Sequence, residues 1–218
     1  MPSSAMEEYL EVIYKLAEKG EVRPSQIAEA LGVSGPTVTA ALKRLGAKDL
    51  ATRPRGRVAL TDEGRIQALA IIRGHRLSER FLADVLGLPL DEVHAEACLL
   101  EHALSPRVQE ALEDFLQRPE YCPHGHPIPS ADGVVATTEG ASLCTRDIGE
   151  RVEIVSVAED DTAMLTYLAS LGLLPGTHML VCDVAPFHGP LLVNVRGSQY
   201  ALGREVADKI LVKSSDRD

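Results

Sequence analysis

The sequence has no tryptophan, and only 4% of its residues are aromatic. No apolar run reaches membrane-spanning length, and the first residues, MPSSAMEEYLEVIY, lack the basic region and apolar core of a signal peptide. The cysteines at positions 98, 122, 144 and 182 form no CxxC pair and are far apart. This spacing suits a reducing compartment better than a disulfide framework. We therefore expect a cytoplasmic protein with no membrane partner.

Acidic residues outnumber basic ones, and the formal net charge is −10. This net negative charge argues against a protein that coats nucleic acid uniformly. Residues 22–60 have the opposite charge balance, since they carry seven arginines and lysines against two acidic residues. Local positive charge on an acidic protein is typical of a focused phosphate-binding surface. The 218 residues are enough for one large domain or for two to three small ones.

The first third of the chain has the pattern of a winged helix-turn-helix domain. Residues 5–18 have helical periodicity, and two shorter helices follow over residues 24–31 and 35–45, with a glycine-bearing turn between them. Ser34 is a plausible N-cap and Pro36 lies in the first turn. Residues 50–61 predict a β-hairpin wing around Pro-Arg-Gly. The expected core positions are Ile27, Ala30, Leu31, Val38, Leu42 and Leu45.

The fold expected for the whole chain is mainly α with small β parts. We place the winged helix-turn-helix domain at 1–62, a helical metal-binding and dimerisation domain at 63–121, a proline- and glycine-rich linker at 122–139, and a small antiparallel barrel with one helix at 140–218. Thr61 and Asp62 are capping candidates for a long helix that we expect to break near Gly74. Asp91 is the expected cap of the next helix.

The stretch VHAEACLLEHALS, residues 93–105, gathers four side chains that bind divalent cations well. On a helix, steps of four and three put His94, Cys98 and Glu101 on one face, and His102 follows at its edge. The alternative is a solvated helix face with a buried cysteine. Two further pairs share helix faces by spacing, and together with this stretch they favour metal binding: Glu8 with Glu11, and His75 with Glu79.

The order of elements and the motifs SGPTV, HRLSERFL, VHAEACLLEH and CPHGHPIP together resemble the diphtheria-toxin-repressor family of metal-dependent transcriptional repressors. Residues 168–197 resemble the SH3-like domain shared with ferrous-iron-transport accessory proteins. The resemblance covers nearly the whole chain. It implies a homodimer that binds double-stranded operator DNA, with a divalent cation as co-repressor and a carboxy-terminal SH3-like barrel.

Carried over by position, the resemblance implies two metal sites. The primary site would use Glu8, Cys98, Glu101 and His102, with Glu11 matching a carboxylate of the manganese branch. The ancillary site would use His75, Glu79, His94 and an acidic residue such as Asp161; His75 could instead serve the primary site. Cys122, His124 and His126 alternate in a way that could chelate, but they match a family linker, so we expect a structural role for them.

The ligand types favour manganese, with iron(II) second. Carboxylate and imidazole suit both ions, whereas thiolate favours softer ions such as zinc. Here the carboxylate of Glu8 matches the manganese branch, whereas the sulfur of Cys98 departs from it. The sequence therefore combines features of the manganese and iron branches of the family. Cys98 could also ligate through its backbone carbonyl, and a redox role for its thiol is the less favoured interpretation.

The expected function is metal-dependent repression, in which a cation ties the first helix to the later ligands. Without the cation, carboxylates would repel one another and leave that helix loosely placed. Residues expected to contact DNA at the start of the recognition helix are Ser34, Pro36, Thr37 and Thr39. Expected phosphate partners are Lys43, Arg44, Arg53, Arg55 and Arg57.

Three other functions compete with this one. A metal-responsive activator, or a sensor of another ion such as zinc, is the main alternative. A metalloenzyme is disfavoured because the chain has no HExxH motif, no nucleophile–base pair and no glycine-rich phosphate loop. A transport adaptor would explain the SH3-like stretch but leaves the winged helix without a role.

Overall fold

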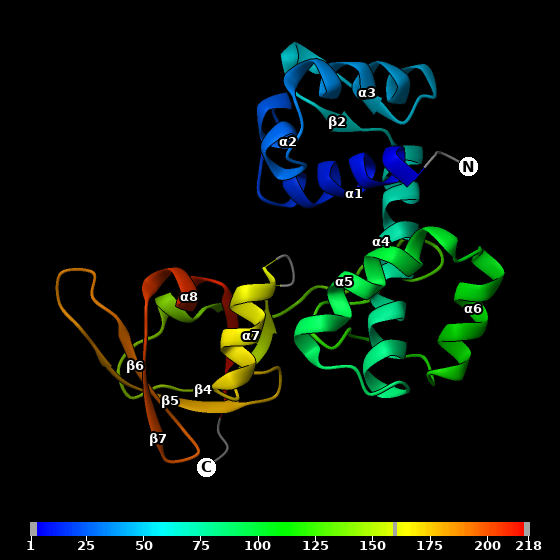
Figure 1. Cartoon of the computed structure of the whole chain (residues 1–218). Coiled ribbons are helices and arrows are strands. Elements are labelled where there is room, and N and C mark those ends of the chain that lie inside the picture. The colour runs from blue at the N-terminus through cyan, green and yellow to red at the C-terminus, as the bar shows by residue number, and fades with distance from the viewer. Residues whose placement is uncertain (1–3, 159–160, 216–218) are drawn as a thin grey trace. The chain divides into compact units, whose positions relative to one another are not determined.

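The computed structural model describes residues 4–158 and 161–215. Helices dominate its first half and an antiparallel sheet its last third (Figure 1). No helix in these described ranges is long and apolar enough to cross a membrane. The elements are α1 (Ser4–Glu18), α2 (Pro24–Ala30), α3 (Gly35–Ala47), β1 (Ala51–Thr52), η1 (Pro54–Gly56), β2 (Ala59–Leu60), α4 (Asp62–Asp84), α5 (Leu90–Leu100), η2 (Glu101–Ala103), α6 (Pro106–Phe115), β3 (Ala141–Ser142), η3 (Leu143–Thr145), β4 (Arg151–Val157), α7 (Thr162–Ser170), β5 (His178–Val184), β6 (Leu191–Val195), β7 (Ser198–Leu202), α8 (Arg204–Asp208) and β8 (Ile210–Ser214).

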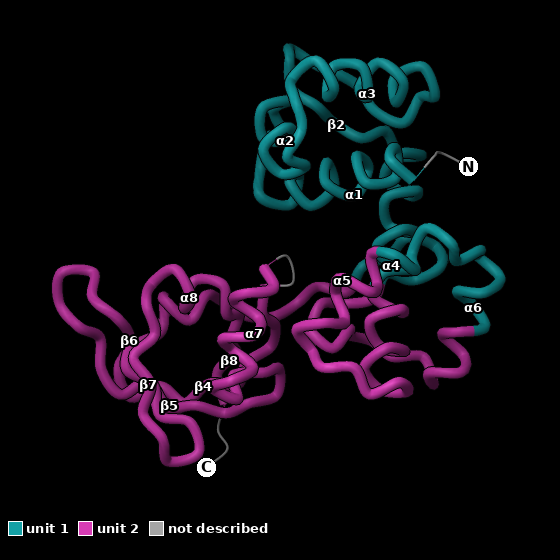
Figure 2. The backbone as a smooth tube through the Cα atoms, in the orientation of Figure 1, with its two compact units in different colours: residues 1–75, 99–111, 129–135 teal, residues 76–98, 112–128, 136–218 magenta. Residues whose placement is uncertain are grey.

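The chain divides into two compact units (Figure 2). Unit 1 comprises residues 1–75, 99–111 and 129–135, and unit 2 comprises residues 76–98, 112–128 and 136–218. The boundary therefore falls inside α4, and both units draw on segments that are far apart in the sequence. The three domains and the linker expected from the sequence remain a prediction.

The predicted winged helix-turn-helix in unit 1 forms as its local signals indicate. The Ser34 side chain accepts a hydrogen bond from the Thr37 backbone N–H at 3.4 Å and caps α3, whose first turn contains Pro36. β1 and β2 pair antiparallel around the 3₁₀ turn η1 and form the predicted hairpin. Of the expected core positions, Ile27, Val38, Leu42 and Leu45 are buried, Leu31 is half-buried and Ala30 is exposed, so the prediction for Ala30 is wrong.

The helix α4 is continuous, so the break expected near Gly74 is wrong. A glycine in a helix interior costs only about 1 kcal/mol relative to alanine, which does not by itself end a helix. Its role here is close packing, because a Cβ on Gly74 would lie 2.8 Å from Nε2 of Gln109. Thr61 caps this helix as predicted, since its Oγ1 accepts from the Gly64 backbone N–H at 3.0 Å.

The helix α5 differs from its predicted form at both ends. It begins at Leu90, so Asp91 lies in its first turn and is not its N-cap; the Asp91 carboxylate instead accepts from the Thr166 hydroxyl at 2.8 Å. It ends at Leu100, and Glu101 and His102 follow in the 3₁₀ turn η2. The single continuous α-helix assumed for residues 93–105 is therefore wrong beyond Leu100.

The last third of the chain is a six-stranded antiparallel sheet with strand order β3-β8-β4-β5-β6-β7. Its core contains buried aliphatic side chains from alternate strand positions and from α7, such as Ile154, Leu165 and Val193. No pairing joins β3 to β7 among the described residues, so a closed barrel is not established. The helix α8 was not predicted.

The proline- and glycine-rich connector is attached to this sheet within unit 2. The Val157 backbone N–H donates to the His124 carbonyl at 3.0 Å, and Nε2 of His126 donates to the Val157 carbonyl at 2.9 Å. A Cβ on Gly125 would lie 2.0 Å from the Val155 carbonyl oxygen, so only glycine allows this approach. The connector is therefore a packed segment with fixed side chains.

Candidate metal centre

Unit 1 brings Glu101 and His102 together with α1 and with His75. Nδ1 of His75 donates to Oε2 of Glu101 at 2.6 Å, and Nε2 of His102 lies 3.3 Å from Oε1 of Glu101. On its other side, Nδ1 of His102 donates to Oε2 of Glu7 at 2.7 Å. His75 and Glu101 are buried. Both oxygens of the Glu101 carboxylate are thus bracketed by imidazoles.

The Glu101 carboxyl has an altered acidity. Burial raises its pKa above the usual value, and the negative charge of Glu11 raises it further, while the hydrogen bond from His75 acts in the opposite direction. The effect of Glu11 indicates that its charge reaches Glu101. Negative charge is concentrated at this point of unit 1, where a cation would be stabilised.

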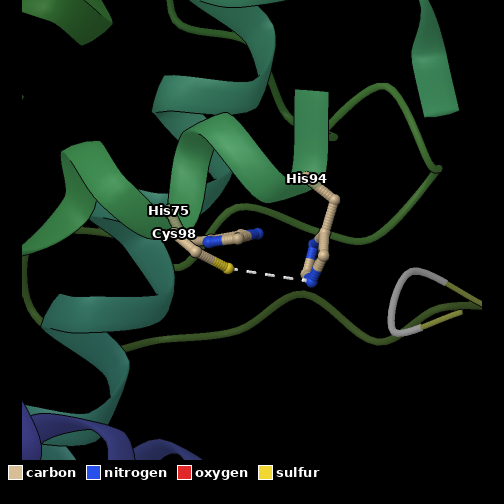
Figure 3. A group of neighbouring side chains, drawn as sticks. All are labelled: His75, His94 and Cys98. Carbon is tan, nitrogen blue, oxygen red and sulfur yellow. Dashed lines mark hydrogen bonds between the residues drawn. The ribbon is translucent and has the colours of Figure 1, made fainter. Parts of the chain in front are cut away.

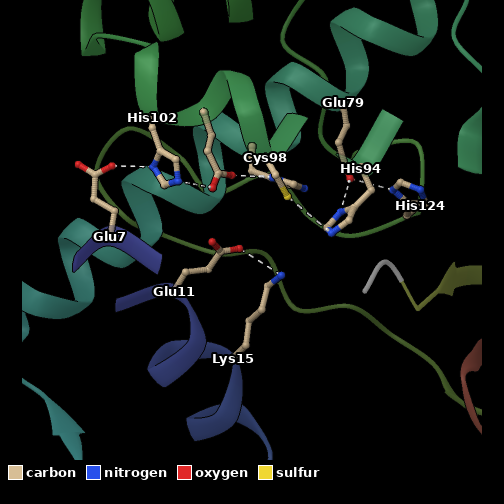
Figure 4. A network of polar contacts seen from close by, with 10 residues as sticks. Glu7, Glu11, Lys15, Glu79, His94, Cys98, His102 and His124 are labelled. Atoms are coloured by element: carbon tan, nitrogen blue, oxygen red, sulfur yellow. Dashed lines mark hydrogen bonds and ion pairs between the residues drawn. The ribbon is translucent and has the colours of Figure 1, made fainter. Parts of the chain in front are cut away.

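The first helix is held in this structure by contacts that do not require a metal. Glu7 is bonded to His102, and Nζ of Lys15 lies 3.1 Å from Oε1 of Glu11 (Figure 4). These contacts offset the charges of Glu7 and Glu11, two of the carboxylates of α1; the loose placement of α1 without a cation remains a prediction. Glu8, the predicted ligand, is exposed one position along the helix. Its role as a ligand remains a prediction.

Unit 2 contains a second cluster, which combines Glu79, a predicted ancillary ligand, with Cys122 and His124, for which a structural role was expected. The ligand atoms of Glu79, Cys122 and His124 lie within 4.8 Å of one another, and all three side chains are buried. Nδ1 of His94 lies 3.3 Å from Oε1 of Glu79 and joins the group at its edge (Figure 4). An ion with bonds of about 2.0–2.3 Å to nitrogen, oxygen and sulfur fits among donors at such separations.

The hydrogen bonding of His124 suits a metal, because it favours one tautomer of the neutral ring. Its Nε2 lies 3.1 Å from the Leu90 carbonyl, which can only accept, so this nitrogen carries the proton. Nδ1 therefore holds a lone pair in the neutral ring; it makes no hydrogen bond although it lies 3.1 Å from Oε1 of Glu79. A backbone carbonyl that fixes the tautomer of a metal-binding histidine is a common feature of metal sites. The donor set fits a divalent cation.

The remaining predicted ligands lie in unit 2 with distinct surroundings. Sγ of Cys98 lies 3.8 Å from Nε2 of His94, one helical turn earlier on α5 (Figure 3, which also draws His75). The Cys98 residue is exposed, so the alternative of a buried cysteine is wrong. Asp161 is the N-cap of α7, where its Oδ1 accepts from the Met164 backbone N–H at 3.0 Å. Its role as a ligand stays a prediction.

The predicted DNA-contacting side chains are accessible on α3 and the wing. Exposed positions are Ser34, Pro36, Thr37, Thr39, Lys43, Arg44, Arg53 and Arg55. Arg57 is only half-exposed and forms an ion pair with Glu21 at 3.2 Å. Arg55 has a φ of +50° at the hairpin turn, which is uncommon for a residue with a side chain.

Sequence reasoning missed Glu7 and Lys15 on α1, and it gave Cys122 and His124 a purely structural role. Glu7 and Lys15 had a usable signal, because both are one helical step of four from Glu11. The alternation of Cys122 and His124 is visible in the sequence, but their partner Glu79 lies on a helix remote from them along the chain. Only the tertiary structure joins them.

Three family models match the chain. They are described as the iron dependent repressor N-terminal DNA binding domain for residues 1–53, the iron dependent repressor metal binding and dimerisation domain for residues 61–130, and the FeoA domain for residues 141–214. Together they span most of the chain in the order that the resemblance implied.

Relatives of nearly full length agree with these matches. The iron-dependent repressor IdeR of Mycobacterium leprae is 35% identical over 222 residues, covering 95% of this chain and 96% of the relative. The diphtheria toxin repressor of Corynebacterium efficiens is 33% identical over 222 residues, covering 96% of this chain and 95% of the relative. These relatives are repressors, in agreement with the expectation that the chain is not an enzyme.

Solved structures give the same result. A manganese-dependent transcriptional repressor in complex with manganese is 36% identical with a TM-score of 0.89, covering 96% of this chain and all (100%) of that chain. The ScaR structure with bound Cd²⁺ is 31% identical with a TM-score of 0.84, covering 95% of this chain and 98% of that chain. The predicted family is confirmed. The chain therefore belongs to the iron-dependent repressor family, which includes the diphtheria toxin repressors.

Proposed function

We propose that this protein is a DNA-binding transcriptional repressor that requires a divalent cation. The observation that supports this most strongly is the group formed by Glu101, His102 and the acidic residues of α1. An ion held there joins α1, which lies before the recognition helix in the sequence, to Glu101 and His102, which lie well after it. The exposed, positively charged wing and α3 supply the DNA-binding surface.

For the primary site we propose Glu8, Glu11, Glu101 and His102, with His75 and Cys98 as further ligand candidates. A cation bound there supplies the positive charge that neutralises these carboxylates. Glu101 would direct one oxygen to the ion while His75 holds the other by its short hydrogen bond. Carboxylate and imidazole ligands suit manganese first and iron(II) second. Relatives described as iron-dependent and as manganese-dependent both occur, which is consistent with this pair.

For the second site we propose Glu79, Cys122 and His124, with His94 and Asp161 as further ligand candidates. This site contains a thiol and a fully buried carboxylate. Thiolate is a softer donor, so this site should accept zinc more readily than the primary site does. A relative of known structure is described with bound Cd²⁺ and with bound Zn²⁺, which supports softer ions in this family.

The repressor should act as a homodimer on palindromic operator DNA. Two recognition helices must match major grooves about one helical turn, or a multiple of it, apart. Holding α1 against residues 101–102 would fix the orientation of the winged helix in each subunit. The match of residues 61–130 to a metal binding and dimerisation domain supports the dimer. By analogy with the family, the regulated genes would encode metal uptake.

The finer architecture is part of the same proposal. We propose that the six-stranded sheet closes into an SH3-like barrel, and that the domains are those of residues 1–62, 63–121 and 140–218 with a linker at 122–139. The match of residues 141–214 to a FeoA domain supports the third of these. Free cysteines and a DNA target are consistent with a cytoplasmic protein.

Retention of DNA fragments tests the proposal, with manganese, iron(II) and zinc titrated separately and a chelator as control. Glu101→Ala and His102→Ala should abolish metal-dependent retention while thermal melting shows that both variants stay folded. Glu96→Ala is the matched control, because Glu96 is an exposed acidic residue of α5. Equal retention by wild type, Glu101→Ala and His102→Ala, with and without chelator, would refute the proposal. Metal-dependent loss of repression in a reporter assay would instead favour an activator.

A further inference from the structure

Lys15 makes an ion pair with a proposed metal ligand inside unit 1. Its Nζ lies 3.1 Å from Oε1 of Glu11, and the two side chains are only 22% and 13% exposed (Figure 4). Pairs of this spacing are common on helix surfaces and usually contribute little to stability. This pair is different in position, because it lies beside the cluster where negative charge gathers.

The Glu11 carboxylate lies beside that cluster. Glu11 is one helical turn after Glu7, whose carboxylate bonds to His102, so both glutamates lie on the same face of α1 (Figure 4). The Glu7 carboxylate accepts a hydrogen bond from Nδ1 of His102. In this structure, therefore, a lysine ammonium neutralises one proposed ligand, and a carboxylate accepts a hydrogen bond from another.

An ammonium group and a divalent cation need the same oxygen lone pairs of Glu11. They also repel each other if both stay near it, and this repulsion is strong where side chains are partly shielded from water. Binding of the ion therefore requires the ammonium to withdraw. The long lysine stem and its partial exposure give the ammonium a path toward solvent.

We propose that Lys15 is an internal competitor of the co-repressor ion at Glu11, and that it raises the metal concentration at which this repressor becomes active. The inference rests on the proposed function of the primary site. Lys15 is not a ligand, yet it would set the metal concentration at which the repressor responds, while the ligands themselves stay the same.

Manganese binding, measured by calorimetry on the full-length chain, tests the competition directly. Lys15→Met keeps an unbranched stem but removes the charge, and should lower the Kd roughly tenfold, as expected for removing one nearby like charge. Lys15→Gln should act in the same direction. Lys15→Arg keeps the charge and should leave the Kd within about twofold of wild type.

Lys19→Met is the matched control. Lys19 is an exposed lysine just beyond the end of α1, so its loss changes the net charge equally but at a distance from Glu11. Its Kd should equal that of wild type. The manganese midpoint for retention of operator-bearing DNA should fall in Lys15→Met by the same factor as the Kd, and thermal melting of the metal-free variants provides the check on folding.

The outcomes separate this inference from the function on which it rests. If Glu101→Ala weakens manganese binding but Lys15→Met binds no more tightly than wild type, the competition is refuted and the metal site stands. Weaker binding by Lys15→Met would also refute it, because Lys15 would then help to position Glu11. If Glu101→Ala leaves binding unchanged, the proposed primary site fails, and the inference about Lys15 fails with it.

Discussion

The Nδ1 atom of His124 and the Oε1 atom of Glu79 face each other at 3.1 Å, and neither side chain is exposed to solvent. When the ring is neutral and Nε2 of His124 donates to the Leu90 carbonyl, two acceptors meet in a buried place. Such a contact is costly unless a proton or a metal ion lies between the two groups. The buried sulfur of Cys122 completes a donor set that favours the metal.

Metal should therefore stabilise the fold through this cluster. At a free ion concentration a hundred times the Kd, binding to the native state alone adds about 2.7 kcal/mol to the free energy of unfolding. Manganese or zinc should raise the melting temperature of wild type, and His124→Gln should lose a large part of that increase. His178→Gln provides the control, because His178 is an exposed histidine of β5 bonded to Ser215. An equal increase in all three proteins would contradict a site at His124.

Neighbouring glutamates of α1 should have separable roles. Glu7→Gln removes the charge from the hydrogen bond to His102 and should lower the free energy of unfolding of the metal-free protein by about 1 kcal/mol. It should keep metal-dependent DNA retention. Glu8→Gln should leave the metal-free stability unchanged, because Glu8 is exposed, but should raise the manganese concentration needed for retention.

Chemical denaturation without metal and retention assays with metal measure the two effects independently. The pair serves as its own control, since both substitutions remove one carboxylate from the same turn of α1. If Glu7→Gln abolishes retention and Glu8→Gln does not, the ligand on α1 is Glu7, and the assignment by position is wrong.

The elements with local signals were predictable from the sequence. Ser34 and Pro36 mark the start of α3, and Pro-Arg-Gly marks the wing, because caps and turns depend on residues within a few positions. The family resemblance could also be recognised from the sequence, because its motifs are short and contiguous. These signals were sufficient for the helix-turn-helix and for the general placement of the sheet.

Features that depend on distant contacts could not be predicted in the same way. No glycine or proline marks the change from α5 to a 3₁₀ turn after Leu100; in the structure, that turn carries the short bond between Glu101 and His75. The cluster of Cys122 and His124 lacks a motif because its carboxylate comes from α4. The repulsion expected among the carboxylates is offset at Glu11 by Lys15, which lies one helical turn further along α1.

Attachment of the connector to the sheet should depend on Gly125. A Cβ at this position would meet the Val155 carbonyl at 2.0 Å, and the backbone φ is +86°. Gly149 has a similar φ of +91° with nothing within 4 Å of its hypothetical Cβ. Both alanine variants should lose about 1 kcal/mol from backbone strain. Gly125→Ala should lose at least about 2 kcal/mol more, because a clash with backbone forces the segment to shift.

Urea denaturation of the metal-bound and metal-free proteins measures this difference. The same shift would move His124 away from Glu79, so Gly125→Ala should also lose part of the stabilisation by metal, whereas Gly149→Ala should keep it. Equal stabilities for the two variants would show that the connector does not pack closely against β4 in solution.

The wing should contribute affinity for DNA without contributing sequence choice. Arg55 is exposed at the hairpin turn, and its charge is suited to a phosphate. Removing one arginine–phosphate interaction should reduce the slope of log K against log salt concentration by about 0.9. Arg55→Gln should therefore weaken binding to operator and to unrelated DNA by similar factors and flatten the salt dependence. Arg107→Gln, at an exposed arginine of α6, should leave the slope unchanged. If Arg55→Gln weakens binding to operator DNA alone, Arg55 contacts bases. If its salt slope equals that of wild type, Arg55 in the wing does not contact a phosphate.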